Sequence, residues 1–136
     1  MGKSLTVGWR SLLSFARAAR FYNYVRPRVT EDGIIEIQGG RHPLQEMVVE
    51  SFQPNDTHIK AGHEETRPKL DDDLPTIQIL TGANGCGKSV YLKQVALIVF
   101  MAQIGSFVPA QSARISVCDQ SEWSCRANGA SCLPDG

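Results

Sequence analysis

Apolar residues recur with helical spacing near the start of the chain. Over residues 4–25 they form one stripe with arginines between its members, which predicts an amphipathic helix. Gly8 weakens its first turns, and Pro27 ends it near Arg26, because the residue before a proline avoids helical backbone angles. A helix packed on a larger neighbour and a transit peptide share this pattern. The stripe consists of Leu5, Leu12, Leu13, Ala16, Ala19 and Phe21 or Tyr22.

The middle of the chain changes from apolar to polar. Residues 34–38 are rich in β-branched side chains and predict a strand. Two glycines and a proline within residues 39–43 predict a turn, in which His42 fits a backbone-bonded turn residue better than a catalytic group. Residues 44–52 fit a short helix or a strand. Residues 55–75 are polar and aperiodic, so we predict a surface loop there.

A strand followed by a helix is predicted next. Residues 76–81 are a short β-branched run, and residues 88–104 fit a helix of about five turns that Gly105 ends. The second half of this helix is apolar nearly all round, as in a helix buried against a sheet. The longest apolar run, residues 95–102, is far below the roughly 18 residues of a membrane span. No periodicity survives past Asp119, and we expect no regular structure over residues 120–136.

Charge and cysteine content add few constraints. Lys plus Arg and Asp plus Glu number 14 each, so net charge does not indicate a polyanionic partner. The first 30 residues are basic and acid-free, and their start also fits a myristoylation pattern. The four cysteines form no Cys-x-x-Cys pair, which favours free thiols in a reducing compartment. The acidic run at residues 71–73 is better explained as solvated than as a cation site.

The chemistry lies in residues 82–89. They match the phosphate-binding pattern G-x-x-x-x-G-K-[ST] at every specified position. They also follow a predicted strand and open a predicted helix, as a loop must when it aims backbone N–H groups at phosphate oxygens. A glycine-rich turn that merely contains a lysine explains this context less well. The predicted phosphate-binding residues are Gly82, Ala83, Asn84, Gly85, Cys86, Gly87, Lys88 and Ser89.

Each residue type has a role in such a loop. Gly82 and Gly87 allow backbone approaches that a β-carbon blocks. Lys88 neutralises the β- and γ-phosphates of a nucleoside triphosphate, and the Ser89 hydroxyl is the predicted Mg²⁺ ligand. Cys86 lies beside a helix N-terminus, where the thiolate is favoured, so its modification should block nucleotide binding.

The order of motifs resembles one family. Residues 81–110 read TGANGCGKSVYLKQVALIVFMAQIGSFVPA. This stretch is similar to the phosphate loop, helix and following turn of MutS-type mismatch-repair ATPases, with their Tyr-x-x-Gln helix and Gly-Ser-[Tyr/Phe]-Val-Pro-Ala exit. Upstream, Gly-Arg-His-Pro at residues 40–43 and Phe-Gln-Pro-Asn-Asp at residues 52–56 also resemble the family. The resemblance covers about residues 12–119, and details of the loop and exit resemble the eukaryotic meiotic branch.

The resemblance implies a fold and a ligand. The fold class is α/β: a partial P-loop NTPase domain of the ABC ATPase type, preceded by a helix and followed by an irregular tail. The implied divisions are a leading helix (1–28), the N-terminal part of the ATPase domain (29–119) and a divergent tail (120–136). ATP and Mg²⁺ are the implied cofactors. Phe52 and Gln53 are implied to contact adenine, although Phe52 fits a core position equally well.

The resemblance also implies a function. The chain is expected to be the ATP-binding segment of a nuclear, DNA-binding ATPase that acts in mismatch repair or meiotic recombination. Its expected partners are a MutS-family subunit and mismatched or branched duplex DNA, with no membrane. Residues 115–119 lack the apolar Asp-Glu strand of a hydrolysing member, so we interpret the chain as truncated and not hydrolytically competent alone. A non-catalytic fragment that binds a MutS-family partner is the alternative, and a small kinase fits less well.

Overall fold

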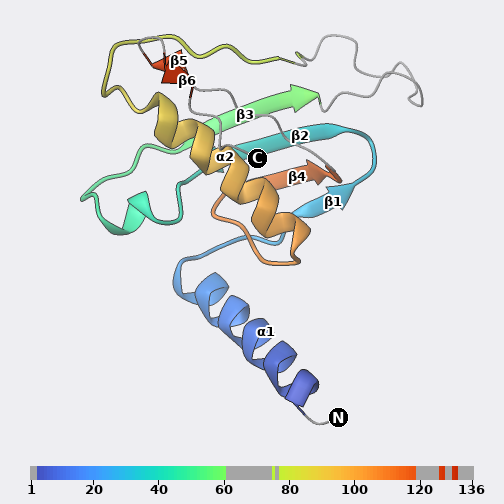
Figure 1. The fold of residues 1–136 in the computed structure, drawn as a ribbon. Helices are drawn as coiled ribbons and strands as arrows, with labels where there is room; N and C mark the ends of the chain where they lie inside the picture. The colour runs from blue at the N-terminus through green and yellow to red at the C-terminus, as the bar shows by residue number, and fades with distance from the viewer. Residues whose placement is uncertain (1–2, 61–74, 76, 119–125, 128–129, 132–136) are drawn as a thin grey trace.

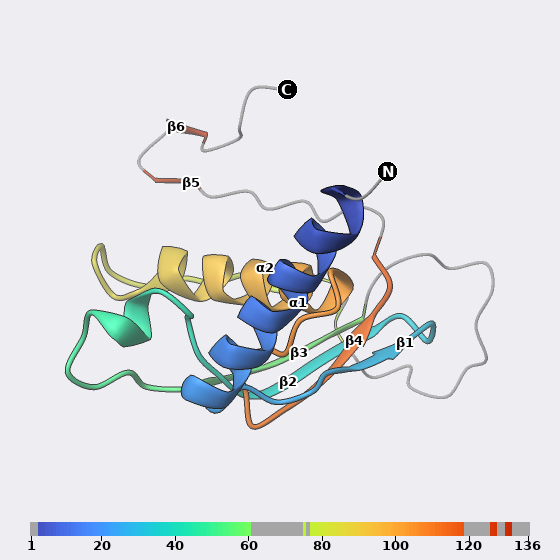
Figure 2. The same ribbon diagram turned by 90° about the horizontal axis from the view of Figure 1, so that it is seen from below.

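The computed structural model describes residues 3–60, 75, 77–118, 126–127 and 130–131. Its elements form a mixed α/β arrangement with one four-stranded sheet and two α-helices (Figure 1). The helix α2 lies along one face of the sheet, as Figure 2 shows from below. Within the described residues, no helix is both long and apolar enough to cross a membrane.

The predicted leading helix is confirmed as α1, Lys3–Phe21. It ends four residues earlier than expected, because Asn23 adopts a left-handed φ of 53° and turns the chain toward the sheet. Ala19 is buried, whereas Trp9 and Phe21 are 72% and 78% exposed. After the helix, Val25 exchanges two backbone hydrogen bonds of 2.9 Å with Val108, which fixes the end of α1 beside the turn that follows α2.

The sheet has the strand order β1-β4-β2-β3. The strands β1 and β4 are parallel, and β2 pairs antiparallel with both β4 and β3. Their bounds are β1 Arg28–Thr30, β2 Ile34–Gly40, β3 Asn55–Lys60 and β4 Ser112–Ser116. The predicted strand over residues 34–38 is therefore confirmed as most of β2.

Three local predictions about the sheet are wrong. Residues 55–60 form β3 rather than the start of a loop, because β2 pairs with their backbone and Thr57 is buried against it. Gly39 and Gly40 end β2, and the turn predicted over residues 39–43 begins only at Pro43. The register shifts between Ile37 and Gly40, and the Gly39 N–H donates to Asp56 Oδ1 at 2.7 Å. Of the strand predicted at residues 76–81, residue 76 lies outside the described residues, and residues 77–81 form no strand. Ile77 and Ile79 are 76% and 82% exposed, and a β-branched run becomes a strand only where a second strand pairs with its backbone.

The segment between β2 and β3 contains a single short helix, η1 Gln45–Met47, which resolves the choice between helix and strand for residues 44–52. His42 holds the turn before it. Its Nδ1 accepts hydrogen bonds from the backbone N–H groups of Leu44 and Gln45 at 3.2 and 3.3 Å. The interpretation of His42 as a backbone-bonded turn residue is confirmed.

The second helix, α2 Lys88–Gln103, supplies most of the core. Gly105 follows its end, and the left-handed φ of 79° at this residue allows the Ser106 N–H to bond back to the Met101 carbonyl. The face of α2 toward the sheet packs on β2, β4 and the turn at residues 108–110. The buried core consists of Ile37, Val95, Ile98, Val99, Ala102, Val108, Ala110, Ala113 and Ile115.

The tail contains a short pair of strands where we predicted irregular structure. Strand β5, Arg126–Ala127, pairs antiparallel with β6, Ala130–Ser131. The other residues of the tail, and the acidic run at 71–73, lie outside the described residues.

The turn at His42 makes the stability of the fold depend on pH. Burial lowers the pKa of His42 below its ordinary 6.5, and nearby Lys93 lowers it further, against the opposing effects of a backbone hydrogen bond and Glu46. The stabilisation is therefore complete above pH 6.5 and is lost as the pH falls through the lowered pKa. Acid should lower the free energy of unfolding of the original protein by on the order of 1 kcal/mol through this group. We expect His42→Asn, which keeps a hydrogen-bond acceptor without a titrating ring, to remove this acid-induced loss. Urea unfolding of both proteins from pH 7.5 to pH 4.5 measures it, and parallel pH profiles would contradict it.

Candidate nucleotide-phosphate site

The loop immediately before α2 forms an open turn. Its residues from Gly82 to Gly87 are exposed, and Gly87 is the N-cap of the helix with a left-handed φ of 93°. Gly85 is also left-handed, at φ 81°. Gly82 has a positive φ of 155°, and a β-carbon there would lie 2.9 Å from the Sγ atom of Cys86, so a side chain at this position would be strained and would displace the thiol. The glycines of the motif thus stand where the backbone requires them.

Lys88 folds back over the loop. Its ammonium donates hydrogen bonds to the Gly82 and Ala83 carbonyls at 2.7 and 2.6 Å, and its Nζ lies 3.5 Å from Cys86 Sγ. A cation is therefore held inside a ring of backbone groups, at the positive end of a helix dipole. An anion that binds here meets the ammonium and the N–H groups at the start of the helix together.

These residues fit the triphosphate of a nucleotide. The loop is open to solvent, its glycines leave room for close approach, and Lys88 can exchange its two carbonyl partners for phosphate oxygens. Ser89 is exposed in the first turn of α2, where a hydroxyl can reach a magnesium ion beside the phosphates. Within the described residues, no group of three His, Cys, Asp or Glu side chains forms a separate metal site.

The predicted base-contact residues lie at the same end of the sheet as the loop. Figures 1 and 2 both place the segment between β2 and β3 beside the N-terminal end of α2. Phe52 is half-buried and Gln53 is exposed near the end of this segment. The Asn55 side-chain amide donates to the Gln53 carbonyl at 3.0 Å and so fixes the backbone there. Contact of either residue with adenine stays a prediction.

Tyr91 is a structural residue of the site to which the sequence analysis assigned no role. Its hydroxyl lies 2.9 Å from Thr57 Oγ1 on β3 and donates to Gln78 Oε1 at 3.2 Å. It thereby joins the first turn of α2 to the sheet and to the chain that enters the phosphate loop. The Tyr-x-x-Gln spacing marks Tyr91 in the sequence. The spacing does not reveal its contacts, because Thr57 and Gln78 lie far from Tyr91 along the chain.

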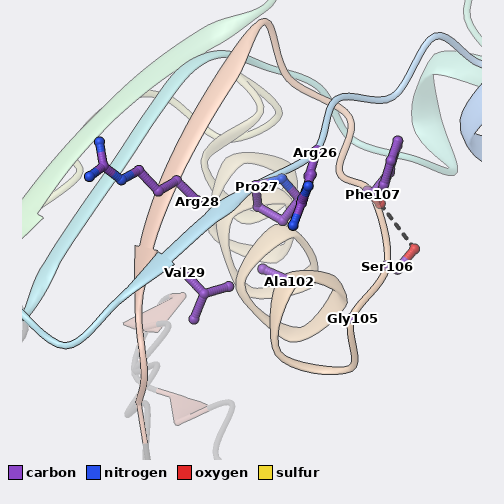
Figure 3. Close-up of a pocket in the computed structure, with 8 residues that line it drawn as sticks. All are labelled: Arg26, Pro27, Arg28, Val29, Ala102, Gly105, Ser106 and Phe107. Carbon is purple, nitrogen blue, oxygen red and sulfur yellow. Dashed lines mark hydrogen bonds between the residues drawn. The ribbon is translucent and has the colours of Figure 1, made fainter.

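A cavity of about 550 Å³ lies at the opposite end of α2, beside Ala102 and Phe107 (Figure 3). Arg26 and Arg28 are among its lining residues, which could suggest an anion site. Figure 3 shows the Arg28 side chain extending away from Ala102 and Gly105, however, and the cavity faces the negative end of the helix dipole. The phosphate loop is therefore the better anion site.

Comparison with known proteins identifies the family of the chain. Residues 78–130 match MutS domain V, and the match includes the first residues of the tail that we expected to diverge. The chain is 50% identical over 111 residues to the DNA mismatch repair protein MutS of Acetivibrio thermocellus. It is 46% identical over 110 residues to MutS protein homolog 5 of Saccharomyces cerevisiae. Each alignment covers 80% of this chain and 12% of the relative. The chain therefore belongs to the MutS family and carries part of its domain V.

Proposed function

We propose that this chain binds ATP with Mg²⁺ through residues 82–89. The observation that carries the proposal is the Lys88 ammonium. It lies against a glycine-rich loop at the start of α2, where it bonds two backbone carbonyls and lies near a thiol that phosphate oxygens can replace. MutS-family membership supports ATP as the nucleotide.

The chain's own residues divide the work of binding. Lys88 compensates the charge of the β- and γ-phosphates, while backbone N–H groups of the loop donate to their oxygens. The Ser89 hydroxyl ligates Mg²⁺, which when bound neutralises phosphate charge. Phe52 supplies an aromatic face for adenine, and Gln53 supplies a polar edge. The eight loop residues thus fix the phosphates, and the segment between β2 and β3 selects the base.

We also propose an activity for the whole protein of which this chain supplies a part, and we base it on the names of the relatives. Several are named DNA mismatch repair proteins, which supports a DNA-binding ATPase that acts on mismatched or branched duplexes with a MutS-family partner. A nuclear protein of the eukaryotic meiotic branch is proposed from the resemblance of the loop and the exit to that branch, since the bacterial and yeast relatives match to similar extents. The chain spans about 12% of the length of these relatives, so it supplies one part of that activity.

A second candidate function is partner binding without catalysis. Ile77 and Ile79 are exposed on a segment that pairs with no described strand, and Trp9 is exposed on α1. Apolar side chains in these places favour a protein neighbour. Co-purification with a co-expressed MutS-family subunit, together with lack of ATP binding, distinguishes this candidate from the first.

Removal of the Lys88 ammonium tests the phosphate site. Charge-assisted hydrogen bonds contribute about 1.5–3 kcal/mol, so Lys88→Ala should weaken Mg·ATP binding at least about tenfold. Equilibrium dialysis with labelled ATP measures this. Lys93→Ala is the matched control, because Lys93 is exposed on the same helix but outside the loop. Equal affinity of the two variants would refute the role of Lys88.

Cys86 provides a second, independent test. Its thiol is exposed within the loop, so a maleimide bound there should block ATP binding, and bound Mg·ATP should slow the labelling. Cys118, which lies after β4, is the internal control whose labelling rate should not change. Mass spectrometry of labelled peptides follows both cysteines. Identical Cys86 labelling with and without ATP would contradict a phosphate site at this loop.

The isolated chain should bind ATP without turnover. The family resemblance assigns Mg²⁺ organisation and water activation to an Asp-Glu pair, and no such pair occurs in these 136 residues. Phosphate release with Mg·ATP should therefore equal that of Lys88→Ala, measured as the background. Turnover that Lys88→Ala abolishes would show that other residues activate the water.

A further inference from the structure

The segment that carries Phe52 and Gln53 leaves and re-enters the sheet at one point. Gly40, the last residue of β2, pairs with Asn55, the first residue of β3. We call this Gly40–Asn55 pair the neck. The register shift just before Gly40 leaves the neck separate from the regular ladder that ends at Ile37 and Thr57. A movement of the neck therefore moves the whole segment between the strands.

Gln94 is the one completely buried amide side chain on α2. It is 0% exposed, and neither its Oε1 nor its Nε2 has a hydrogen-bond partner among the described residues. Burial of two unpaired polar atoms is unfavourable, because both lose hydrogen bonds to water and gain none in return. An aliphatic residue of similar size would fill this place without that cost. The amide therefore has a use that packing alone does not explain.

The Gln94 amide lies against the neck. A β-carbon added to Gly40 would be 2.9 Å from Gln94 Nε2 and 3.1 Å from the Asn55 carbonyl oxygen. The Gln94 amide nitrogen, a donor, and the Asn55 carbonyl oxygen, an acceptor, thus both lie close to the Cα atom of Gly40. A side chain at Gly40 would therefore press on the amide, on the Ile37 side chain and on the Asn55 carbonyl.

Tyr91 acts one turn before Gln94 on the same helix. Its hydroxyl contacts Thr57 Oγ1, and it also lies 3.5 Å from the carbonyl of Asp56, the residue after the neck. Residues three apart share a helix face, so Tyr91 and Gln94 both face the start of β3. The helix that begins at Lys88 is thereby connected to the segment that carries Phe52.

We propose that Gln94 is a positioning residue that couples base contact to the phosphate loop. Its amide donates to the neck backbone when a nucleotide base engages the segment between β2 and β3. The hydrogen bond then holds that segment at a fixed distance from α2 and from Lys88 at its start. This inference rests on the proposed ATP site and deepens it. It predicts that Gln94 contributes to binding of ATP but not to binding of a triphosphate without a base.

Gln94→Met tests the coupling, because methionine keeps the size of the side chain and removes both polar atoms. ATP and inorganic tripolyphosphate are compared as competitors of labelled ATP, using the whole 136-residue chain with Mg²⁺. The preference for ATP over tripolyphosphate should fall about fivefold, the loss expected for one neutral hydrogen bond. Tripolyphosphate affinity should stay within about twofold of the original, since its contacts involve the loop alone.

Two further variants make the result specific. Gln103→Met is the matched control: the same substitution on the same helix, where the exposed Gln103 amide donates to the Cys118 carbonyl, far from the neck in sequence. Tyr91→Phe removes the second connection and should lower the ATP preference in the same direction, which keeps the test available if Gln94→Met does not fold. Circular dichroism melting reports folding of each variant.

The outcomes separate the two proposals. An unchanged ATP preference in folded Gln94→Met, or an equal fall in Gln103→Met, overturns the role of Gln94 and leaves the ATP site intact. If Gln94→Met does not fold, an unchanged preference in Tyr91→Phe overturns the coupling. If the unsubstituted chain binds neither ATP nor tripolyphosphate, the ATP site itself is refuted, and the coupling is refuted with it.

Discussion

The structure depends on the burial of α2 against the sheet. Val95, Ile98 and Val99 are almost completely buried on the face of the helix toward β2 and β4. Burial of each such side chain contributes about 1.5–3 kcal/mol, so this packing is a major part of the stability of the fold. It also fixes the axis of α2, and with it the position of the exposed loop at the start of the helix. The phosphate loop has few contacts of its own and takes its placement from the helix behind it.

The polar contacts at the N-terminal half of α2 then connect this helix to the rest of the site. Tyr91 links it to Thr57 on β3 and to Gln78, which precedes the loop. The Lys88 ammonium donates to the carbonyls of Gly82 and Ala83 and so joins the start of the helix to the loop. The apolar packing of α2 on the sheet therefore stabilises the domain. The polar contacts near the start of α2 instead fix the position of the loop relative to the sheet and to the segment before β3.

Sequence reasoning predicted the features that depend on local pattern. The helical stripe before Pro27, the helix after Lys88 and the β-branched run of β2 were all recognisable because their signals lie within one element. The motif of the predicted phosphate loop is equally local, since it lies in eight consecutive residues, and its role stays a prediction. His42 was correctly assigned to a backbone-bonded turn for the same reason.

Features that depend on distant partners were missed or wrong. Strand β3 is polar and resembles a loop until β2 pairs with it, and β1 is only three residues long. Strand β4 does alternate, with Ala113 and Ile115 buried, but the polar residues around it obscured the pattern. Residues 77–81 have strand composition without a described partner. The burial of Gln94 could not be predicted, because it follows from the approach of α2 to Gly40 and not from neighbouring residues.

The most direct test of the central claim is an ¹H–¹⁵N NMR titration of the chain with Mg·ATP, which reports on each backbone N–H group separately. If the loop before α2 holds the phosphates, the largest shifts fall on the amides of residues 82–89, and smaller shifts fall on Phe52 and Gln53. Shifts elsewhere with an unperturbed loop, or no shifts at millimolar ATP, would contradict a phosphate site at the start of α2.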